Sequence, residues 1–220
     1  AIGTAKLFNL RLSKNFDYPY FSVSVRRFWR RWHSTLASWL RDYVYIPLGG
    51  SRVGPWRRAF NLLATFLLVG LWHGAAWTFV IWGGLHGSYL IVESRLRGCG
   101  ARAGGERRRA AAGVLAGVVV FALVTFAWVF FRAPSLGAAT EYLVQAVTRP
   151  LGAGDFGRFV PTLLLSAALL GYERLTRGWE HGLAVSAAPL PARWAAYLGI
   201  GMALLFFGFL GGTQGIYVQF

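Results

Sequence analysis

The chain has 220 residues, of which 55% are hydrophobic and only 14% are charged, and its mean hydropathy is +0.45. A soluble domain normally carries about 25% charged residues, so this chain has too few charges to coat a water-exposed surface. The net charge of +15 comes almost entirely from arginines beside apolar runs, as in cytoplasmic membrane flanks. Composition therefore predicts a membrane protein whose partner is the lipid bilayer, with no nucleic-acid partner.

Residues 1–50 are expected to form a segment at the membrane surface. After a polar entry, Ser22 or Ser24 can cap a helix that ends before a proline and a Gly-Gly turn. On a helical wheel the aromatic side chains occupy one arc, the arginines occupy the opposite arc, and His33 lies on the border. This pattern predicts one amphipathic helix over residues 24–45, lying in the interface with its aromatic face toward lipid.

Residues 59–92 contain no Asp, Glu, Lys or Arg. A single helix of that length would span about 51 Å, well beyond the roughly 30 Å hydrocarbon core of a bilayer. Arginine-rich flanks on both sides predict that the segment enters and returns on the cytoplasmic side. We expect two helices or a re-entrant pair that turns near His73-Gly74. The glycines that offer places to break are Gly70, Gly74, Gly83 and Gly84.

For the rest of the chain, the sequence predicts a basic loop over residues 93–109 and three transmembrane spans within residues 110–212. Ser135 can cap a short surface helix that runs through about Val147. Pro161 is expected in the first turn of the second span. The spans are predicted over residues 110–131, 159–175 and 194–212. The predicted fold class is therefore all-α, a polytopic transmembrane helical protein.

His73 is the strongest candidate for chemistry, because an ionisable side chain inside an apolar run is costly to bury. A neutral imidazole suits proton abstraction near pH 7. The alternative is a core histidine hydrogen-bonded to a neighbouring helix or stacked on Trp77. The sequence leaves both open. Judged by its own segment alone, His33 is interpreted as an interfacial histidine that binds lipid headgroups. His86 is interpreted as a structural hydrogen-bonding residue near a helix end, and His181 is expected at a solvated surface.

Other chemistries lack their signatures. The sequence contains no HExxH, GxSxG or P-loop motif, and His73 and His86 do not share a helix face. We therefore expect no metal site and no bound cofactor. The single cysteine, Cys99, excludes an internal disulfide framework, and in a basic loop it is not expected to carry an acyl group.

Several motifs occur in one order along the chain and together resemble the membrane-bound O-acyltransferase family. The similarity is greatest to the bacterial branch that O-acetylates alginate and transfers D-alanine to teichoic acids. The motifs are FWRRWH (28–33), LRDYVYIPLGG (40–50), GLWHG (70–74), WGGLHG (82–87), WVFFRA (128–133) and IYVQF (216–220).

The resemblance implies that His73 is the family's catalytic histidine. It also implies that His33 occupies the second catalytic position, which carries Asn or Asp in other branches. Family members place these groups in a tunnel, with a thioester donor such as acetyl-CoA entering from the cytoplasm and an acceptor hydroxyl from the far side. The tunnel candidates here are Trp72, Trp77, Trp82 and His86.

We therefore expect residues 1–220 to be the C-terminal portion of one acyltransferase domain in the bacterial inner membrane, with a preceding N-terminal half. The expected partners are the acyl donor and either an exported polysaccharide or a periplasmic acetyltransferase. Two alternatives stay open at this stage. The chain could belong to a non-catalytic subunit that presents an acyl group to a partner enzyme, or to a scaffold for polysaccharide export.

Overall fold

A computed structural model of the chain describes residues 2–99, 106–149, 152–176 and 188–207. All regular structure in these ranges is helical, and no strand occurs within them. The chain divides into two compact units, Ala1–Gly152 and Ala153–Phe220, and each is described by itself. The all-α prediction is confirmed for the described residues.

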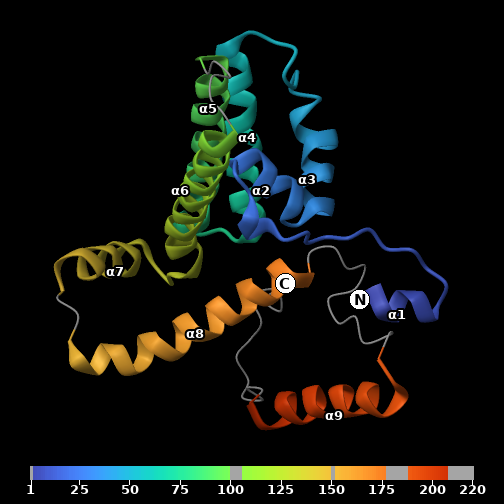
Figure 1. Cartoon of the computed structure of the whole chain (residues 1–220). Helices are drawn as coiled ribbons and strands as arrows, with labels where there is room; N and C mark the ends of the chain where they lie inside the picture. The colour runs from blue at the N-terminus through green and yellow to red at the C-terminus, as the bar shows by residue number, and fades with distance from the viewer. Residues whose placement is uncertain (1, 100–105, 150–151, 177–187, 208–220) are drawn as a thin grey trace. The chain divides into compact units, whose positions relative to one another are not determined.

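The centre of the first unit is an antiparallel hairpin of two long helices, α4 (Pro55–His73) and α5 (Trp77–Cys99) (Figure 1). The Arg95 guanidinium lies over the Trp56 ring, 5.2 Å from its centroid, so the start of α4 and the end of α5 meet. The prediction of two helices that turn near His73-Gly74 is confirmed. This geometry also brings the two arginine-rich flanks to the same end of the hairpin.

Gly70 and Gly83 do not break these helices, contrary to the role that the sequence suggested for them. A Cβ atom at Gly70 would lie 2.3 Å from the Phe79 carbonyl oxygen, and one at Gly83 would lie 2.2 Å from that of Phe66. Only the absence of a side chain lets the two backbones approach this closely. Such contacts between small residues are characteristic of helix packing inside membranes.

Helix α6 (Glu106–Arg132) packs against α5, and α7 (Leu136–Thr148) follows it. The Ser135 hydroxyl accepts a hydrogen bond of 3.1 Å from the backbone N–H of Ala138, so the predicted cap is confirmed. The prediction of a loop over residues 93–109 is wrong for the described part of this range, because α5 continues to Cys99 and α6 begins at Glu106. Residues 100–105 lie outside the described ranges. Within the described residues, one helical segment, Ala112–Arg132, is long and apolar enough to cross a bilayer, with a mean hydropathy of 2.6.

The N-terminal region begins with α1 (Ile2–Leu7) and a short 3-10 turn, η1 (Pro19–Phe21). The prediction of one continuous helix over residues 24–45 is wrong. Three elements occupy this range, with a break at His33. They are α2 (Val25–Arg31), α3 (Ser34–Leu40) and a π-helical turn, η2 (Arg41–Tyr45). The predicted cap is present, since the Ser24 hydroxyl accepts from the N–H of Arg27 at 3.1 Å.

Protein, not lipid, covers most of the aromatic face of α2. Phe28 is 1% exposed and Trp29 is 7% exposed, and both belong to a core shared with α4, α5 and α6. The Trp29 ring lies 4.9 Å from the Phe66 ring. The expectation of a lipid-facing aromatic arc is therefore wrong for α2, whereas Trp39 on α3 is exposed.

The second unit contains α8 (Ala153–Thr176) and α9 (Leu190–Phe207). Helices are present where the second and third spans were predicted, but α8 begins six residues earlier than residue 159. Pro161 consequently lies inside the helix instead of in its first turn. Residues 208–212 of the third predicted span lie outside the described ranges.

Candidate active site

His73 is the last residue of α4, and its partly buried imidazole is surrounded by aromatic rings. The ring centroids of Trp82 and Phe131 lie 5.1 Å and 5.0 Å away, and both rings meet the imidazole nearly at right angles. The centroid of the Trp72 ring lies 4.8 Å from that of His73. The three aromatic residues come from α5, α6 and α4, so this aromatic cluster depends on the packing of all three helices.

Gly74 ends α4 and makes room for one further ring of this cluster. A Cβ atom at Gly74 would lie 2.7 Å from the Phe79 ring. That ring in turn lies 6.3 Å from His73 and 5.1 Å from Phe131. Gly74 therefore allows the Phe79 ring, in the first turn of α5, to pack beside the His73 imidazole.

His33 lies at the break between α2 and α3, in the left-handed region with φ 45° and ψ 54°. Few non-glycine residues adopt this conformation, although His, Asn and Asp do so more often than others. Its Nδ1 atom is buried and has no hydrogen-bond partner among the described residues. Such a conformation persists only where the surrounding structure holds it, and it is often found at functional sites.

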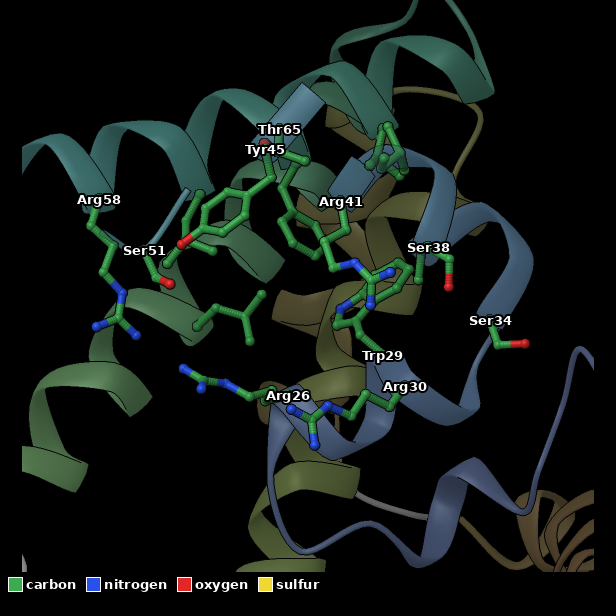
Figure 2. A pocket seen from close by; sticks show the side chains of 16 residues that line it. Arg26, Trp29, Arg30, Ser34, Ser38, Arg41, Tyr45, Ser51, Arg58 and Thr65 are labelled. Carbon is green, nitrogen blue, oxygen red and sulfur yellow. The ribbon is translucent and has the colours of Figure 1, made fainter. Parts of the chain in front are cut away.

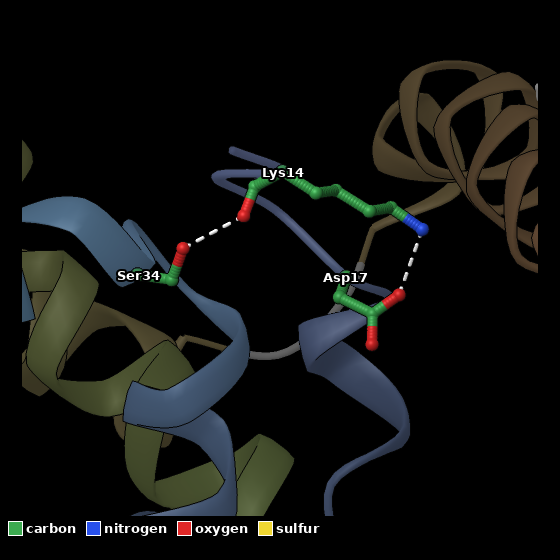
Figure 3. Close-up of polar contacts among 3 residues, drawn as sticks. All are labelled: Lys14, Asp17 and Ser34. Atoms are coloured by element: carbon green, nitrogen blue, oxygen red, sulfur yellow. Dashed lines mark hydrogen bonds and ion pairs between the residues drawn. The ribbon is translucent and has the colours of Figure 1, made fainter. Parts of the chain in front are cut away.

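A strap of residues 14–17 holds the break from both sides. The Ser34 hydroxyl donates to the Lys14 carbonyl at 2.7 Å, and Lys14 pairs with Asp17 at 2.8 Å (Figure 3). The backbone N–H of Asp17 donates to the Arg31 carbonyl before the break, at 2.9 Å. The Asn15 side chain accepts from Thr35 after the break, with its Oδ1 3.0 Å from the backbone nitrogen and 2.9 Å from the hydroxyl. These contacts fix the backbone on each side of His33.

The structure brings His33 and His73 into one neighbourhood. The Phe16 ring links His33 to Trp32, with its centroid 5.9 Å from the His33 ring and 5.0 Å from the Trp32 ring. Trp128 of α6 connects the surroundings of the two histidines, because its ring lies 5.1 Å from Trp32 and 6.0 Å from Trp82. Packing around Trp128 therefore links the segment that carries His33 to the rings that surround His73.

The other predicted site residues have different surroundings. Trp82 is 1% exposed and walls the His73 cluster, whereas Trp77 is 72% exposed and has no ring contact with His73. His86 is 1% exposed, and its Nδ1 atom accepts a hydrogen bond of 3.2 Å from the indole N–H of Trp29. His86 is thus a core residue that ties α5 to α2. His181 lies outside the described residues.

Sequence reasoning did not select Phe131 and Trp128 as site residues. Their aromatic run near the end of α6 resembles the belt of aromatic residues that anchors spans at the membrane surface. The Trp128 and Phe131 rings lie 5.0 Å apart, and Phe131 contacts His73 directly. The WVFFRA motif could have identified these two residues from the sequence, because it is one of the motifs that carry the family resemblance.

Comparison with known proteins gives one family match. The membrane-bound O-acyltransferase family matches residues 11–133, which include both His33 and His73. The matched range also contains the 14–17 strap and the aromatic cluster.

Individual relatives also match part of the chain. A probable alginate O-acetylase AlgI from Azotobacter vinelandii is 47% identical over 139 residues, which are 63% of this chain and 26% of that protein. A peptidoglycan O-acetyltransferase from Helicobacter pylori is 43% identical over 143 residues, or 65% of this chain and 26% of the relative. A teichoic acid D-alanyltransferase from Bacillus subtilis is 32% identical over 95 residues, or 39% and 24%. The chain spans about a quarter of the length of these curated relatives.

Proposed function

Because this chain belongs to the membrane-bound O-acyltransferase family, we propose that it carries the reacting groups of a membrane-embedded O-acetyltransferase. The donor is a cytoplasmic thioester such as acetyl-CoA, and the acceptor is a hydroxyl of an exported polysaccharide. The observation that carries the proposal is the position of His73. It lies inside a ring of aromatic side chains that is connected through Trp128 to the segment carrying His33, whose backbone is held in a left-handed turn.

In the proposed reaction, His73 acts as the general base. It removes the proton from the acceptor hydroxyl as the oxygen attacks the thioester carbonyl carbon. The new C–O bond forms, the C–S bond breaks, and the proton held by His73 passes to the departing thiolate. The histidine is neutral again at the end, and the products are an O-acyl ester and a free thiol.

The surroundings of His73 suit this role. His33 orients or polarises the reacting groups, and its Nδ1 atom has no protein partner within the described ranges to compete with a substrate. Trp72, Trp82 and Phe131 enclose the imidazole and limit access of water, which would hydrolyse the thioester. Cys99 at the end of α5 has no part in this scheme.

We further propose a multi-pass arrangement in the bacterial inner membrane. The apolar segment Ala112–Arg132 supports one crossing, and the uncharged stretches 159–172 of α8 and 194–207 of α9 are the proposed further crossings. Residues 50–58 and 95–109 share the cytoplasmic side, as the contact between Trp56 and Arg95 supports. With three later spans, loop 133–158 is outside, loop 176–193 is inside and residue 220 is outside.

Reporter fusions test this topology. A phosphatase or fluorescent reporter inserted in the 95–109 loop should give the cytoplasmic signal, and one fused after residue 220 should give the periplasmic signal. An odd number of spans between the two points requires opposite signals. Matching signals would show that one of the three later helices does not cross the membrane.

The acetylation proposal itself is tested in cells. O-acetyl groups on the exported polysaccharide are measured with and without the gene for the full-length protein, and they should be lost without it. Unchanged O-acetyl content would contradict the proposal. Turnover of the thioester by purified protein without partners separates an enzyme from a subunit that only presents the acyl group to a periplasmic acetyltransferase. Loss of acetylation on changing His73 separates either role from a scaffold.

A further inference from the structure

A cavity of about 360 Å³ is lined by residues near the two histidines in sequence, such as Ser34 and Val69, but by neither His33 nor His73 (Figure 2). Residues of α2, α3, η2, α4 and α5 line it. Four guanidinium groups surround this space, those of Arg26, Arg30, Arg41 and Arg58. The proposed acetyl transfer uses none of these residues.

The charge around this arginine cavity is balanced only in part by the described residues, among which the Glu93 carboxylate accepts a hydrogen bond of 3.1 Å from the backbone N–H of Arg26. Arg41 pairs with its neighbour Asp42 at 2.7 Å, but no ion pair joins Arg26, Arg30 or Arg58 to a carboxylate in the described residues. The Nε atom of Arg58 is buried without a hydrogen-bond partner among them. A buried guanidinium nitrogen without a partner is costly, so the arrangement favours an anionic occupant.

The floor of the cavity is apolar. It is formed by side chains that belong to the core of the first unit, among them Trp29, Phe66 and Val69, which are at most 9% exposed. A small inorganic anion would gain nothing from such a floor. An anion attached to an apolar group would satisfy both surfaces, and the Ser38 hydroxyl on the lining can bind the polar atoms between them.

We propose that this cavity binds the headgroup of an anionic phospholipid such as phosphatidylglycerol. Arginine guanidinium groups match phosphate oxygens in charge and geometry. The cavity takes the glycerophosphate head together with the first carbons of an acyl chain, which cover the apolar floor, while the rest of the chains stays in the bilayer. Arg58 lies near the start of α4, the end that positive-inside reasoning places at the anionic cytoplasmic leaflet. The proposal rests on membrane embedding and not on the acyl-transfer chemistry.

Lipid selectivity of the full-length protein tests the proposal. The purified protein is reconstituted into phosphatidylcholine vesicles with a trace of spin-labelled phosphatidylglycerol or spin-labelled phosphatidylcholine. The motionally restricted fraction gives the relative affinity for the two lipids. Arg26→Gln and Arg58→Gln should each lower the preference for phosphatidylglycerol about fivefold, as expected for about 1 kcal/mol per arginine.

The matched controls are Arg27→Gln and Arg57→Gln, which remove the same charge from exposed neighbours that do not line the cavity. They should leave the lipid preference unchanged. An equal loss in Arg57→Gln and Arg58→Gln would overturn the proposal, because diffuse surface charge would then explain it. Release of the labelled lipid by soluble coenzyme A would also overturn it and would assign the cavity to the phosphates of a soluble donor. Thermal unfolding in detergent identifies any variant that fails to fold.

Discussion

His73→Ala is expected to abolish acyl transfer while the full-length protein remains inserted and folded. Loss of a general base typically costs about 10²–10⁴-fold in rate, and the aromatic cluster contains no other base among the described residues to replace it. Folding should survive because an alanine at membrane depth removes a polar group that is costly to bury. The measurement is thioester turnover by purified protein, with the thermal unfolding midpoint recorded on the same sample.

Two further variants define what His73 does. His73→Gln should be as inactive as the alanine variant, because an amide can form a hydrogen bond but cannot accept the proton at neutral pH. His86→Ala should act mainly through stability, since it removes the acceptor of the Trp29 indole N–H from the core. Near-wild-type turnover by either His73 variant would make His73 a structural histidine and end the catalytic assignment.

Gly83→Ala should strongly destabilise the α4–α5 hairpin. The new Cβ atom would lie 2.2 Å from the Phe66 carbonyl oxygen and 3.2 Å from the Gly70 backbone nitrogen. Both are backbone atoms within helices, so neither can move away without separating the helices. Overpacking costs typically about 1–3 kcal/mol and occasionally more, against a total stability of about 5–15 kcal/mol. The measurement is the thermal unfolding midpoint and the yield of folded protein in detergent.

Gly84→Ala is the matched control, because the next residue of the same helix has room for a methyl group. Its nearest contact would be a Leu67 side-chain carbon at 3.6 Å, an ordinary van der Waals distance. Alanine is the better helix former by about 1 kcal/mol, so this variant should be neutral or slightly more stable. Equal midpoints for the two variants would show that the helices are not held in close contact at Gly83.

The parts of the fold that depend on local signals could be predicted from the sequence. The length of the uncharged run and its two basic flanks required a turn, and the structure has it at His73-Gly74. The serine caps at Ser24 and Ser135 were identified by residue type and position, and both hydrogen bonds are present. In each case the decisive interaction lies within one turn of the residue that signals it.

The parts that depend on tertiary packing could not be predicted. A helical wheel shows that Phe28 lies on an apolar face, but lipid and protein interior are both apolar, so the pattern does not reveal which of them covers it. The same limit applies to Gly70 and Gly83, whose role depends on a carbonyl in another helix. The left-handed turn at His33 depends on contacts with the 14–17 strap, which is distant in sequence. The periodicity of residues 24–45 does not reveal these contacts.

The left-handed turn at residue 33 also restricts evolution and mutagenesis at this position. Most side chains are disfavoured there before any chemistry is considered, whereas His, Asn and Asp tolerate the conformation. By resemblance, these are the residue types that different branches of the family carry at this position. Backbone compatibility and polar chemistry therefore select the same few residue types. An alanine substitution at His33 changes the backbone preference and removes the polar side chain at the same time. A comparison of His33→Asn with His33→Ala separates the imidazole from the turn that presents it.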